Sequence, residues 1–366
     1  MQCQNPIAIK KAGSIKGWIE VPCGRCLACL ETRRSVWTFR ILEELKVAET
    51  ARFVTLTYDE KNLPWINEKQ QIGTIWEQDT ALKKSKRLEA SLNKKDLTNF
   101  LKKLRNDILK EQTRLIEGSN DELRDEANRY LKMNEQSAKW SPRVRYFAAG
   151  EYGSKPIKGD VERPHYHIIL FNIPAKWYKW DPIHKEWYSK KLETLWNKGN
   201  IQISEVVRES AHYCAKYTIK SLLDEWDDED IREPPYAVMS RNPGLGINYT
   251  YNEQNRNYHN GSKVSHRGIE GGYNQPIGRY LKDKIWPEEE TEFSGIRVWP
   301  KERRDATKKT NSYVQQNKDA EFNNAIRETE GDIQEAEQKI IRDRKRQFKE
   351  AIRARKIKQL KEKGKL

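Results

Sequence analysis

The sequence has no long run of apolar residues, and this absence excludes a membrane-spanning protein. No stretch approaches the roughly twenty apolar residues that a helix needs to cross a bilayer, and residues 1–6 show no hydrophobic core of a signal peptide. Cysteine is also scarce, with five in 366 residues, and without an export signal we expect no framework of disulfides. We therefore expect a protein that stays where it is made and has no membrane partner.

Negative charge is also in deficit. The formal net charge is +15, 34% of the residues are charged and the mean hydropathy is -0.98. Twelve tryptophans and sixteen tyrosines offer flat faces on which unpaired bases could stack. A nucleic acid is therefore the expected partner. The 36% of hydrophobic residues can still build a core, so we expect one main domain with exposed appendages.

Two histidines lie two residues apart in a segment that predicts a buried strand, Pro164–Phe171. Side chains alternate between the two faces of a strand, so His165 and His167 point the same way. Two imidazoles on one face can bind one divalent cation. The alternative is that both are structural histidines with hydrogen-bond partners.

A short helix is predicted at residues 209–220, with Ser210 as its N-cap. Tyr213, Lys216 and Tyr217 stand at positions i, i+3 and i+4 and so share one face. The hydroxyl of tyrosine ionises near pH ~10, but beside a lysine and a metal-bound phosphate it can serve as a nucleophile. The alternative is that both tyrosines only pack against a sheet.

Four of the five cysteines lie near the N-terminus: Cys3, Cys23, Cys26 and Cys29. They could bind a structural Zn²⁺ or an iron–sulfur cluster, or remain reduced thiols without a metal. The spacing Cys-x-x-Cys-x-x-Cys is tight for one zinc ion, and the paired knuckles of a zinc ribbon are absent. Cys214 is expected to pack in the core.

The hydrophobic pattern predicts an α+β chain. Helices are expected at 33–48, 97–108 and 191–196, and strands at 52–59, 143–149 and 201–207, in addition to the histidine strand and the tyrosine helix. Residues 60–92 show no clear period and are expected to be irregular. The resulting order, β-α-β-β-α-β-α, predicts a central antiparallel sheet with helices on one face.

The composition divides the chain into four parts. Residues 1–50 form a Cys-rich N-terminal segment and helix, residues 51–230 the core with a charged insertion at about 110–142, residues 231–300 a loop-rich extension and residues 301–366 a charged, basic helical tail. The end of the tail, residues 339–366, holds thirteen lysines and arginines against three acidic residues. It could neutralise phosphates without reading sequence, or act only as a solvated tail.

Several short motifs occur in a fixed order along the first 290 residues. Together they resemble the HUH endonucleases that initiate rolling-circle replication, and most of all the replication initiation proteins of gokushoviruses, small single-stranded DNA phages of the microvirus family. The resemblance depends on Pro22–Cys29, Phe53–Asp59, Gly150–Gly153, Arg163–His167, Tyr213–Tyr217 and Met239–Gly246.

The resemblance implies an RRM-like HUH fold in which His165 and His167 hold a divalent cation, Mg²⁺ or Mn²⁺. Glu151 is the candidate third ligand. Asp59, Glu209 and His212 compete for that place. Tyr213 would be the first nucleophile and Tyr217 the second, and Lys216 would stabilise charge on the phosphate.

The implied function is metal-dependent, site-specific nicking and strand transfer on single-stranded DNA at a phage origin, through a 5′-phosphotyrosine intermediate. This reaction would start and end rolling-circle replication. It would take place in the cytoplasm of the bacterial host, with the host helicase and polymerase as partners. The alternatives are a related plasmid initiator, relaxase or transposase, or a non-catalytic nucleic-acid-binding protein.

Overall fold

The computed structural model of this chain describes residues 3, 6–10, 18–74, 88–117, 144–153, 162–207, 210–215, 230–260, 265–267, 274–290, 297–343, 346–347 and 350. The chain divides into two compact units, one of residues 1–32, 257–276 and 285–366, the other of residues 33–256 and 277–284. We call these the first and the second unit. Helices and strands occur in both, so the predicted α+β class is confirmed.

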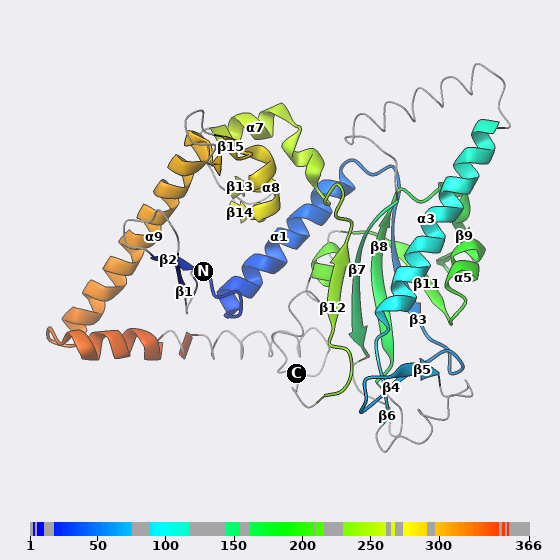
Figure 1. Cartoon of the computed structure of the whole chain (residues 1–366), viewed down its shortest axis with the longest axis horizontal. Coiled ribbons are helices and arrows are strands. Elements are labelled where there is room, and N and C mark those ends of the chain that lie inside the picture. Colours follow the sequence, from blue (N-terminus) through cyan, green and yellow to red (C-terminus); the bar gives the residue numbers. More distant parts are fainter. Residues whose placement is uncertain are drawn as a thin grey trace. The chain divides into compact units, whose positions relative to one another are not determined.

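In the described part of the second unit, seven strands form one sheet in the order β12-β7-β8-β3-β11-β10-β9 (Figure 1). Every neighbouring pair is antiparallel, as predicted. The histidine strand is β8, which is hydrogen-bonded to β7 on one side and β3 on the other. The strand bounds are β3 Ala51–Thr57, β7 Arg145–Tyr152, β8 Pro164–Phe171, β9 Lys179–Asp181, β10 Glu186–Tyr188, β11 Ile201–Glu205 and β12 Tyr236–Met239.

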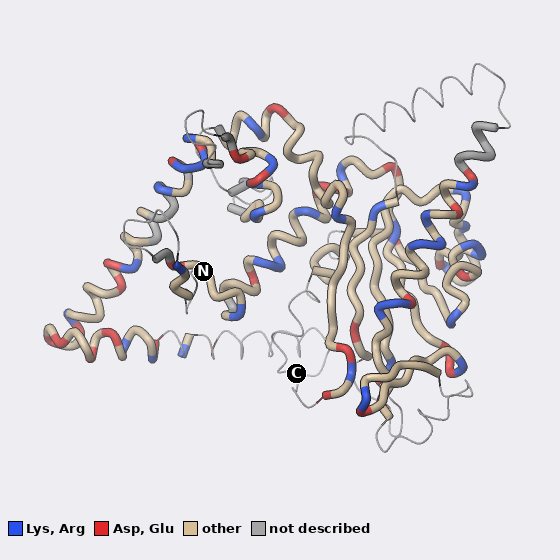
Figure 2. The backbone as a smooth tube through the Cα atoms, in the orientation of Figure 1, with Lys and Arg blue, Asp and Glu red and all other residues tan. Residues whose placement is uncertain are grey.

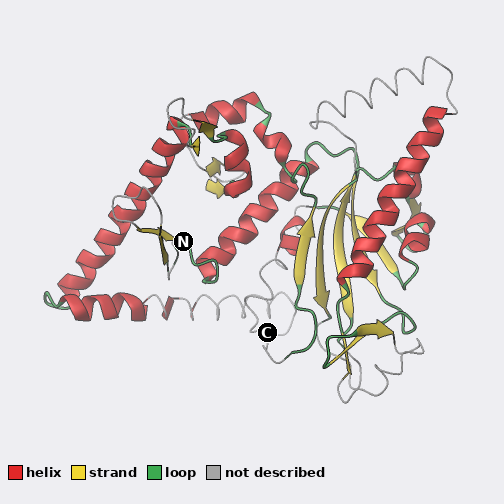
Figure 3. Ribbon diagram, viewed as in Figure 1, coloured by secondary structure: helices red, strands yellow, loops and turns green. Residues whose placement is uncertain are grey.

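One face of this sheet packs against two of the predicted helices, and Figure 3 shows the longer one lying across the strands. These are α3 (Lys94–Glu117) and α5 (Lys190–Trp196), with the 3₁₀ turn η1 (Ala175–Trp177) beside them. The hydroxyl of Tyr166, on β8, is buried on this face, donates to the carbonyl of Asn93 at 2.8 Å and accepts from the amide of Asn93 at 2.9 Å. Tyr166 thereby holds β8 against the entry to α3.

The opposite face is covered too, which corrects the prediction of helices on one face. Helix α1 (Leu27–Leu45) places Ile41 there, and the helical residues 210–215 add Ala211 and Cys214, against Ile169 and Phe171 of β8. The continuous apolar run of β8 is the physical reason, because successive side chains face opposite ways and a run without polar alternation needs cover on both faces.

Residues 60–92 are more regular than predicted. In the described part of this stretch, β4 (Pro64–Asn67), β5 (Ile72–Thr74) and β6 (Leu88–Ala90) form a small antiparallel sheet in the order β5-β4-β6. Strands of three or four residues are too short to show a period in the sequence. The predicted insertion begins inside α3, and its residues 118–142 lie outside the described residues.

The stretch 231–300, predicted to be rich in loops, contributes to the core as well. Its strand β12 joins the main sheet, and Leu245, Ile247 and Leu281 are buried. Its further elements are η2 (Ile247–Thr250), α7 (Glu253–Asn260), β13 (Ser265–Arg267), β14 (Asn274–Pro276), α8 (Gly278–Ile285), β15 (Glu289–Glu290) and β16 (Arg297–Val298).

The first unit contains an N-terminal hairpin and the start of the predicted charged tail. The hairpin consists of β1 (Ile7–Lys10) and β2 (Trp18–Val21). Helix α9 (Lys301–Glu328) carries charges of both signs along its length (Figure 2), and residues 333–343 are also helical. Residues 351–366, the end of the basic tail, lie outside the described residues. None of the described helices is both long enough and apolar enough to span a bilayer.

Candidate metal and nucleophile site

The two histidines of β8 share one face of the sheet, as their spacing predicts. His165 and His167 lie on the side of Ile169 and Phe171, whereas Tyr166 and Ile168 lie on the side of α3. Both imidazoles therefore project from the face covered by α1 and by the tyrosine segment, residues 210–215. Since β8 is paired on both sides, the backbone that carries them is held by two ladders of hydrogen bonds.

Glu151 is brought to the histidines by the register between β7 and β8, in which it is the partner of His165. One carboxylate oxygen, Oε1, lies 2.9 Å from Nε2 of His165 and 2.7 Å from Nε2 of His167. Each of the three side chains offers one ligand atom, and these atoms all lie within 4.8 Å of one another. The described residues thus contain a group of two nitrogen donors and one oxygen donor that could hold a metal ion.

The other ring nitrogens have partners of their own. Nδ1 of His165 lies 3.1 Å from the carbonyl oxygen of Arg163, and Nδ1 of His167 lies 3.0 Å from the hydroxyl oxygen of Thr55. A carbonyl can only accept, so Nδ1 of His165 carries a proton in that contact. These contacts turn both Nε2 atoms toward Glu151, which is how outer hydrogen bonds orient metal-binding histidines.

Glu151 is ionised where it lies. Burial alone would raise the pKa of this carboxyl, but hydrogen bonds from His165 and His167 and their electrostatic attraction outweigh burial and hold the pKa well below its ordinary value. A buried carboxylate is costly unless it is paired. Glu151 and His167 are buried, and His165 is half-buried, so the cluster is open to solvent only on the His165 side.

Tyr213 is the described tyrosine of the predicted pair, and it lies beside the cluster. Its ring centroid is 5.2 Å from that of His167 and 6.1 Å from that of Phe53, both edge to face. Phe53 in turn stacks on His167 at 5.5 Å. Tyr213 is 42% exposed, so its ring packs at the cluster while part of the side chain reaches solvent. Cys214, its neighbour, is fully buried, as expected.

The remaining predicted site residues divide into two groups. Lys216, Tyr217 and Glu209 lie outside the described residues. Of the competitors of Glu151, Asp59 accepts hydrogen bonds from the backbone and side chain of Asn62 in a turn. Neither Asp59 nor His212 belongs to the ligand cluster that the described residues form, which contains Glu151.

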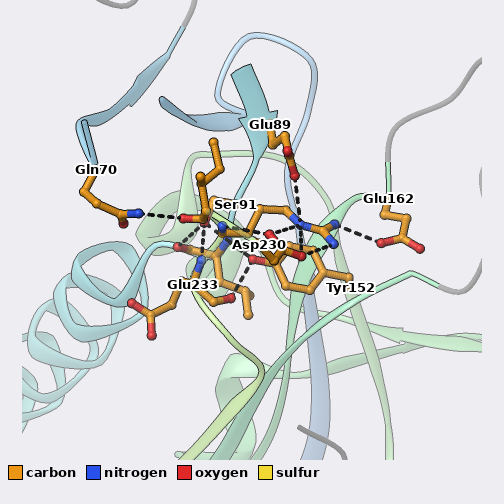
Figure 4. Close-up of polar contacts among 10 residues, drawn as sticks. Gln70, Glu89, Ser91, Tyr152, Glu162, Asp230 and Glu233 are labelled. Carbon is orange, nitrogen blue, oxygen red and sulfur yellow. Dashed lines mark hydrogen bonds and ion pairs between the residues drawn. The ribbon is translucent and has the colours of Figure 1, made fainter. Parts of the chain in front are cut away.

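Arg232 anchors the end of the β7–β8 pair at which the cluster lies, and no sequence pattern pointed to it. Its guanidinium pairs with Asp230 at 2.7 Å, Glu162 at 2.9 Å and Glu89 at 3.3 Å, within the network of Figure 4. It also lies over the ring of Tyr152, 4.7 Å from the centroid. Tyr152 follows Glu151 and Glu162 precedes the histidines, so Arg232 joins the two strands that carry the ligands.

The motif Met239–Gly246 is structural in this fold. The buried Glu44 of α1 pairs with Arg145 of β7 and accepts the amide of Gly246 at 2.8 Å, and Arg145 donates to the carbonyl of Pro243 at 2.9 Å. Gly246 has φ of 74°, and a Cβ there would lie 3.0 Å from the carbonyl oxygen of Arg40. Charge pairing and close backbone contact therefore fix this loop on α1.

The four N-terminal cysteines also come together, in the first unit. Each offers one sulfur, and the four sulfurs lie within 4.8 Å of one another. Burial would raise the pKa of the Cys23 thiol, but the backbone N–H groups of Cys26 and Arg25 outweigh it and lower the pKa to about 6. Burial raises the pKa of Cys29.

Comparison with known proteins gives matches of one kind. Residues 51–222 match a family model of replication-associated proteins of the ORF2 type. Replication-associated protein VP4 of Bdellovibrio phage phiMH2K is 26% identical over 279 residues, which cover 74% of this chain and 70% of the relative. Replication-associated protein ORF2 of Spiroplasma virus 4 is 27% identical over 244 residues, covering 65% and 59%.

A third relative, Replication-associated protein ORF4 of Chlamydia phage 1, is 25% identical over 166 residues, 40% of this chain and 36% of its own length. No solved structure matches. The family region begins with β3 and includes the His165, His167 and Glu151 cluster as well as Tyr213. The resemblance inferred from the motifs is thereby confirmed, and the chain is related to the replication-associated proteins of microvirus-type phages.

Proposed function

We propose that this protein is a replication initiator that nicks single-stranded DNA at a phage origin and transfers the cut strand to one of its own tyrosines. The observation that supports the proposal best is the meeting of two imidazoles and one carboxylate on one sheet face, with the ring of Tyr213 beside His167. The names of the relatives agree with a role in phage replication.

The donor set fits a divalent cation. His165, His167 and Glu151 would hold it through Nε2, Nε2 and Oε1, which already converge. When bound, such an ion polarises a non-bridging phosphate oxygen and neutralises charge that develops during the displacement. Three protein ligands leave coordination positions for substrate oxygens, and a carboxylate together with a phosphate suits Mg²⁺ or Mn²⁺.

Tyr213 would be the nucleophile that opens the strand. Its hydroxyl oxygen forms a bond to the phosphorus, the bond from phosphorus to the 3′ oxygen breaks, and the phenol loses its proton while the 3′ oxygen gains one. The products are a 5′-phosphotyrosine and a free 3′-hydroxyl, which primes a host polymerase. The partial exposure of Tyr213 leaves room for a strand to approach.

Lys216 and Tyr217 complete the proposed reaction. One helical turn after Tyr213, Lys216 would stabilise the charged phosphate and Tyr217 would share the face of Tyr213. Tyr217 would cut the regenerated origin after one round, and the new 3′-hydroxyl would then resolve the first phosphotyrosine and close the circle without ATP. We place this reaction in the cytoplasm of a bacterial host, with the host helicase and polymerase as partners.

A covalent-adduct experiment tests the proposal. Labelled single-stranded phage-type DNA is incubated with the protein and Mn²⁺ or Mg²⁺, with EDTA as control, and the mixture is run under denaturing conditions. We expect a metal-dependent protein–DNA adduct that Tyr213→Phe weakens and that the double change Tyr213→Phe and Tyr217→Phe abolishes. Tyr188→Phe is a matched control, because Tyr188 is 41% exposed, lies in the same unit and is no part of the cluster.

The opposite result would favour a non-catalytic nucleic-acid-binding protein. If wild-type protein binds the DNA tightly but forms no adduct with either metal, the histidines and Glu151 are a structural hydrogen-bonded group. An adduct that survives in the double tyrosine variant would remove both tyrosines from the mechanism. A plasmid initiator, relaxase or transposase would instead form adducts on other origin sequences.

A further inference from the structure

The cysteine cluster is separate from the proposed reaction and is assembled from three places in the chain. Cys3 precedes strand β1, Cys23 follows strand β2, and Cys26 and Cys29 lie around the start of α1. Sγ of Cys23 lies 4.0 Å from Sγ of Cys29, and Sγ of Cys26 lies 3.8 Å from Sγ of Cys3. Cysteines twenty or more residues apart thus meet at one point.

The sulfur spacing distinguishes between the states that the sequence leaves open. A disulfide bond is about 2.05 Å long, far shorter than the 3.8 and 4.0 Å found here, and no disulfide joins these four described cysteines. With zinc–sulfur bonds of about 2.3 Å, a tetrahedral ion separates its sulfurs by about 3.8 Å. A multi-iron cluster places its thiolates on different iron atoms and so separates them more widely. The observed spacing fits one tetrahedral ion.

The backbone around the cluster is arranged for thiolates. The amides of Arg25 and Cys26 point at Sγ of Cys23, at 3.5 and 3.3 Å, and the amide of Cys23 points at Sγ of Cys3 at 3.2 Å. Gly24 makes this turn possible, since its φ of 74° is disfavoured for residues with a Cβ. Such N–H donors offset the negative charge of metal-bound sulfurs.

The elements that the cluster joins have little else to hold them. All four residues of β1 are exposed, and its apolar residues Ile7 and Ile9 are 49% and 42% exposed. An isolated two-stranded hairpin is marginally stable in water. The cluster lies at the base of this hairpin, where β1 begins and β2 ends, and so closes it against the first turn of α1.

We propose that Cys3, Cys23, Cys26 and Cys29 bind one Zn²⁺ ion in a closed site of four thiolates that holds the N-terminal hairpin to the start of α1. Four sulfur ligands complete the coordination of zinc, which is typical of structural rather than catalytic sites. Binding displaces the thiol protons, so one ion replaces up to four protons at this point.

The test is the metal content of the purified full-length protein. We expect about one zinc per chain, lost in Cys23→Ser and in Cys29→Ser. Cys214→Ala is the control, because Cys214 is buried in the other unit, lies outside the cluster and should leave the zinc content unchanged. Co²⁺ in place of zinc should give the absorption bands of a tetrahedral thiolate complex, in wild type and in Cys214→Ala but in neither serine variant.

A titration of the wild-type protein keeps the test decisive where a serine variant does not fold. A thiol-reactive mercurial should release the zinc in proportion to the modification of four thiols, measured with a zinc indicator dye. The proposal is overturned if the protein binds neither zinc nor Co²⁺, if it carries iron in place of zinc, or if Cys23→Ser retains the metal. None of these readouts depends on DNA cleavage.

Discussion

The two ligand clusters of this chain differ in almost every physical respect. The cluster of Glu151, His165 and His167 combines nitrogen and oxygen donors on adjacent strands of a large sheet, whereas the cysteine cluster combines four sulfurs at a hairpin base and a helix start. Three donors leave coordination positions for a substrate, and four thiolates leave none. Donor number and donor type, which follow from the fold, therefore separate a proposed reaction site from a proposed structural site.

Metal removal should affect the two clusters differently and to the largest extent. After gel filtration into metal-free buffer we expect no DNA cleavage, full recovery on adding Mn²⁺, and an unchanged zinc content of about one ion per chain, because oxygen-rich sites exchange their ions readily and thiolate sites do not. Cleavage and elemental analysis on the same sample provide the measurement. Cleavage that persists without added metal would contradict the assignment of the histidine cluster.

Loss of one imidazole should come next in size. His167→Ala should lower the rate of metal-dependent cleavage by more than about 100-fold, because loss of an outer-shell partner alone costs 10- to 100-fold. His184→Ala is the matched control, since His184 pairs with Asp181 at 2.7 Å on an exposed turn of the same unit. Equal rates for the two variants would show that His167 is structural, and circular dichroism would verify that both are folded.

Thr55 tests whether the orientation of an imidazole matters. Thr55→Val keeps the shape of the side chain but removes the hydroxyl that lies 3.0 Å from Nδ1 of His167. We expect Mn²⁺ to bind about 10-fold more weakly, as measured by calorimetry. Thr55→Ser restores the hydroxyl and should restore most of the affinity. If valine and serine behave alike, the hydroxyl does not position His167.

Gly24 tests the cysteine cluster, with the smallest expected effect. No atom lies within 4 Å of a Cβ built on Gly24, so Gly24→Ala meets only the cost of its positive φ. That cost is about 1 kcal/mol, which should weaken zinc binding up to about 10-fold in a competition assay with an indicator dye. Gly24→Asn should cost less, because asparagine tolerates this conformation better. A larger loss for asparagine than for alanine would contradict this explanation.

The sequence predicted the parts of the site that depend on short spacings. The alternation of β8 predicts a common face for His165 and His167, and the structure agrees. Glu151 required more, because its place opposite His165 depends on the register of β7 against β8, which the motif resemblance supplied. Thr55 and Arg163, which orient the imidazoles, become visible only once the neighbouring backbone is in place.

Long-range packing accounts for most of what the sequence did not predict. Arg232 reaches Glu89, Glu162 and Asp230, and no local pattern links residues 70 and 143 positions apart. The short strands around Trp65 have no period that could be read. The second covered face of the sheet was in principle readable, because Ile168 to Phe171 form a continuous apolar run.

Strand β8 carries two independent kinds of constraint on alternate residues. Toward α3, Tyr166 ties the strand to both polar groups of Asn93, while His165 and His167 project from the other face with Glu151. A change at Tyr166 should therefore affect folding and a change at either histidine should affect chemistry. Among relatives under selection, we expect substitutions along this strand to follow a period of two, with the scaffold positions drifting together with residue 93 and the ligand positions held fixed.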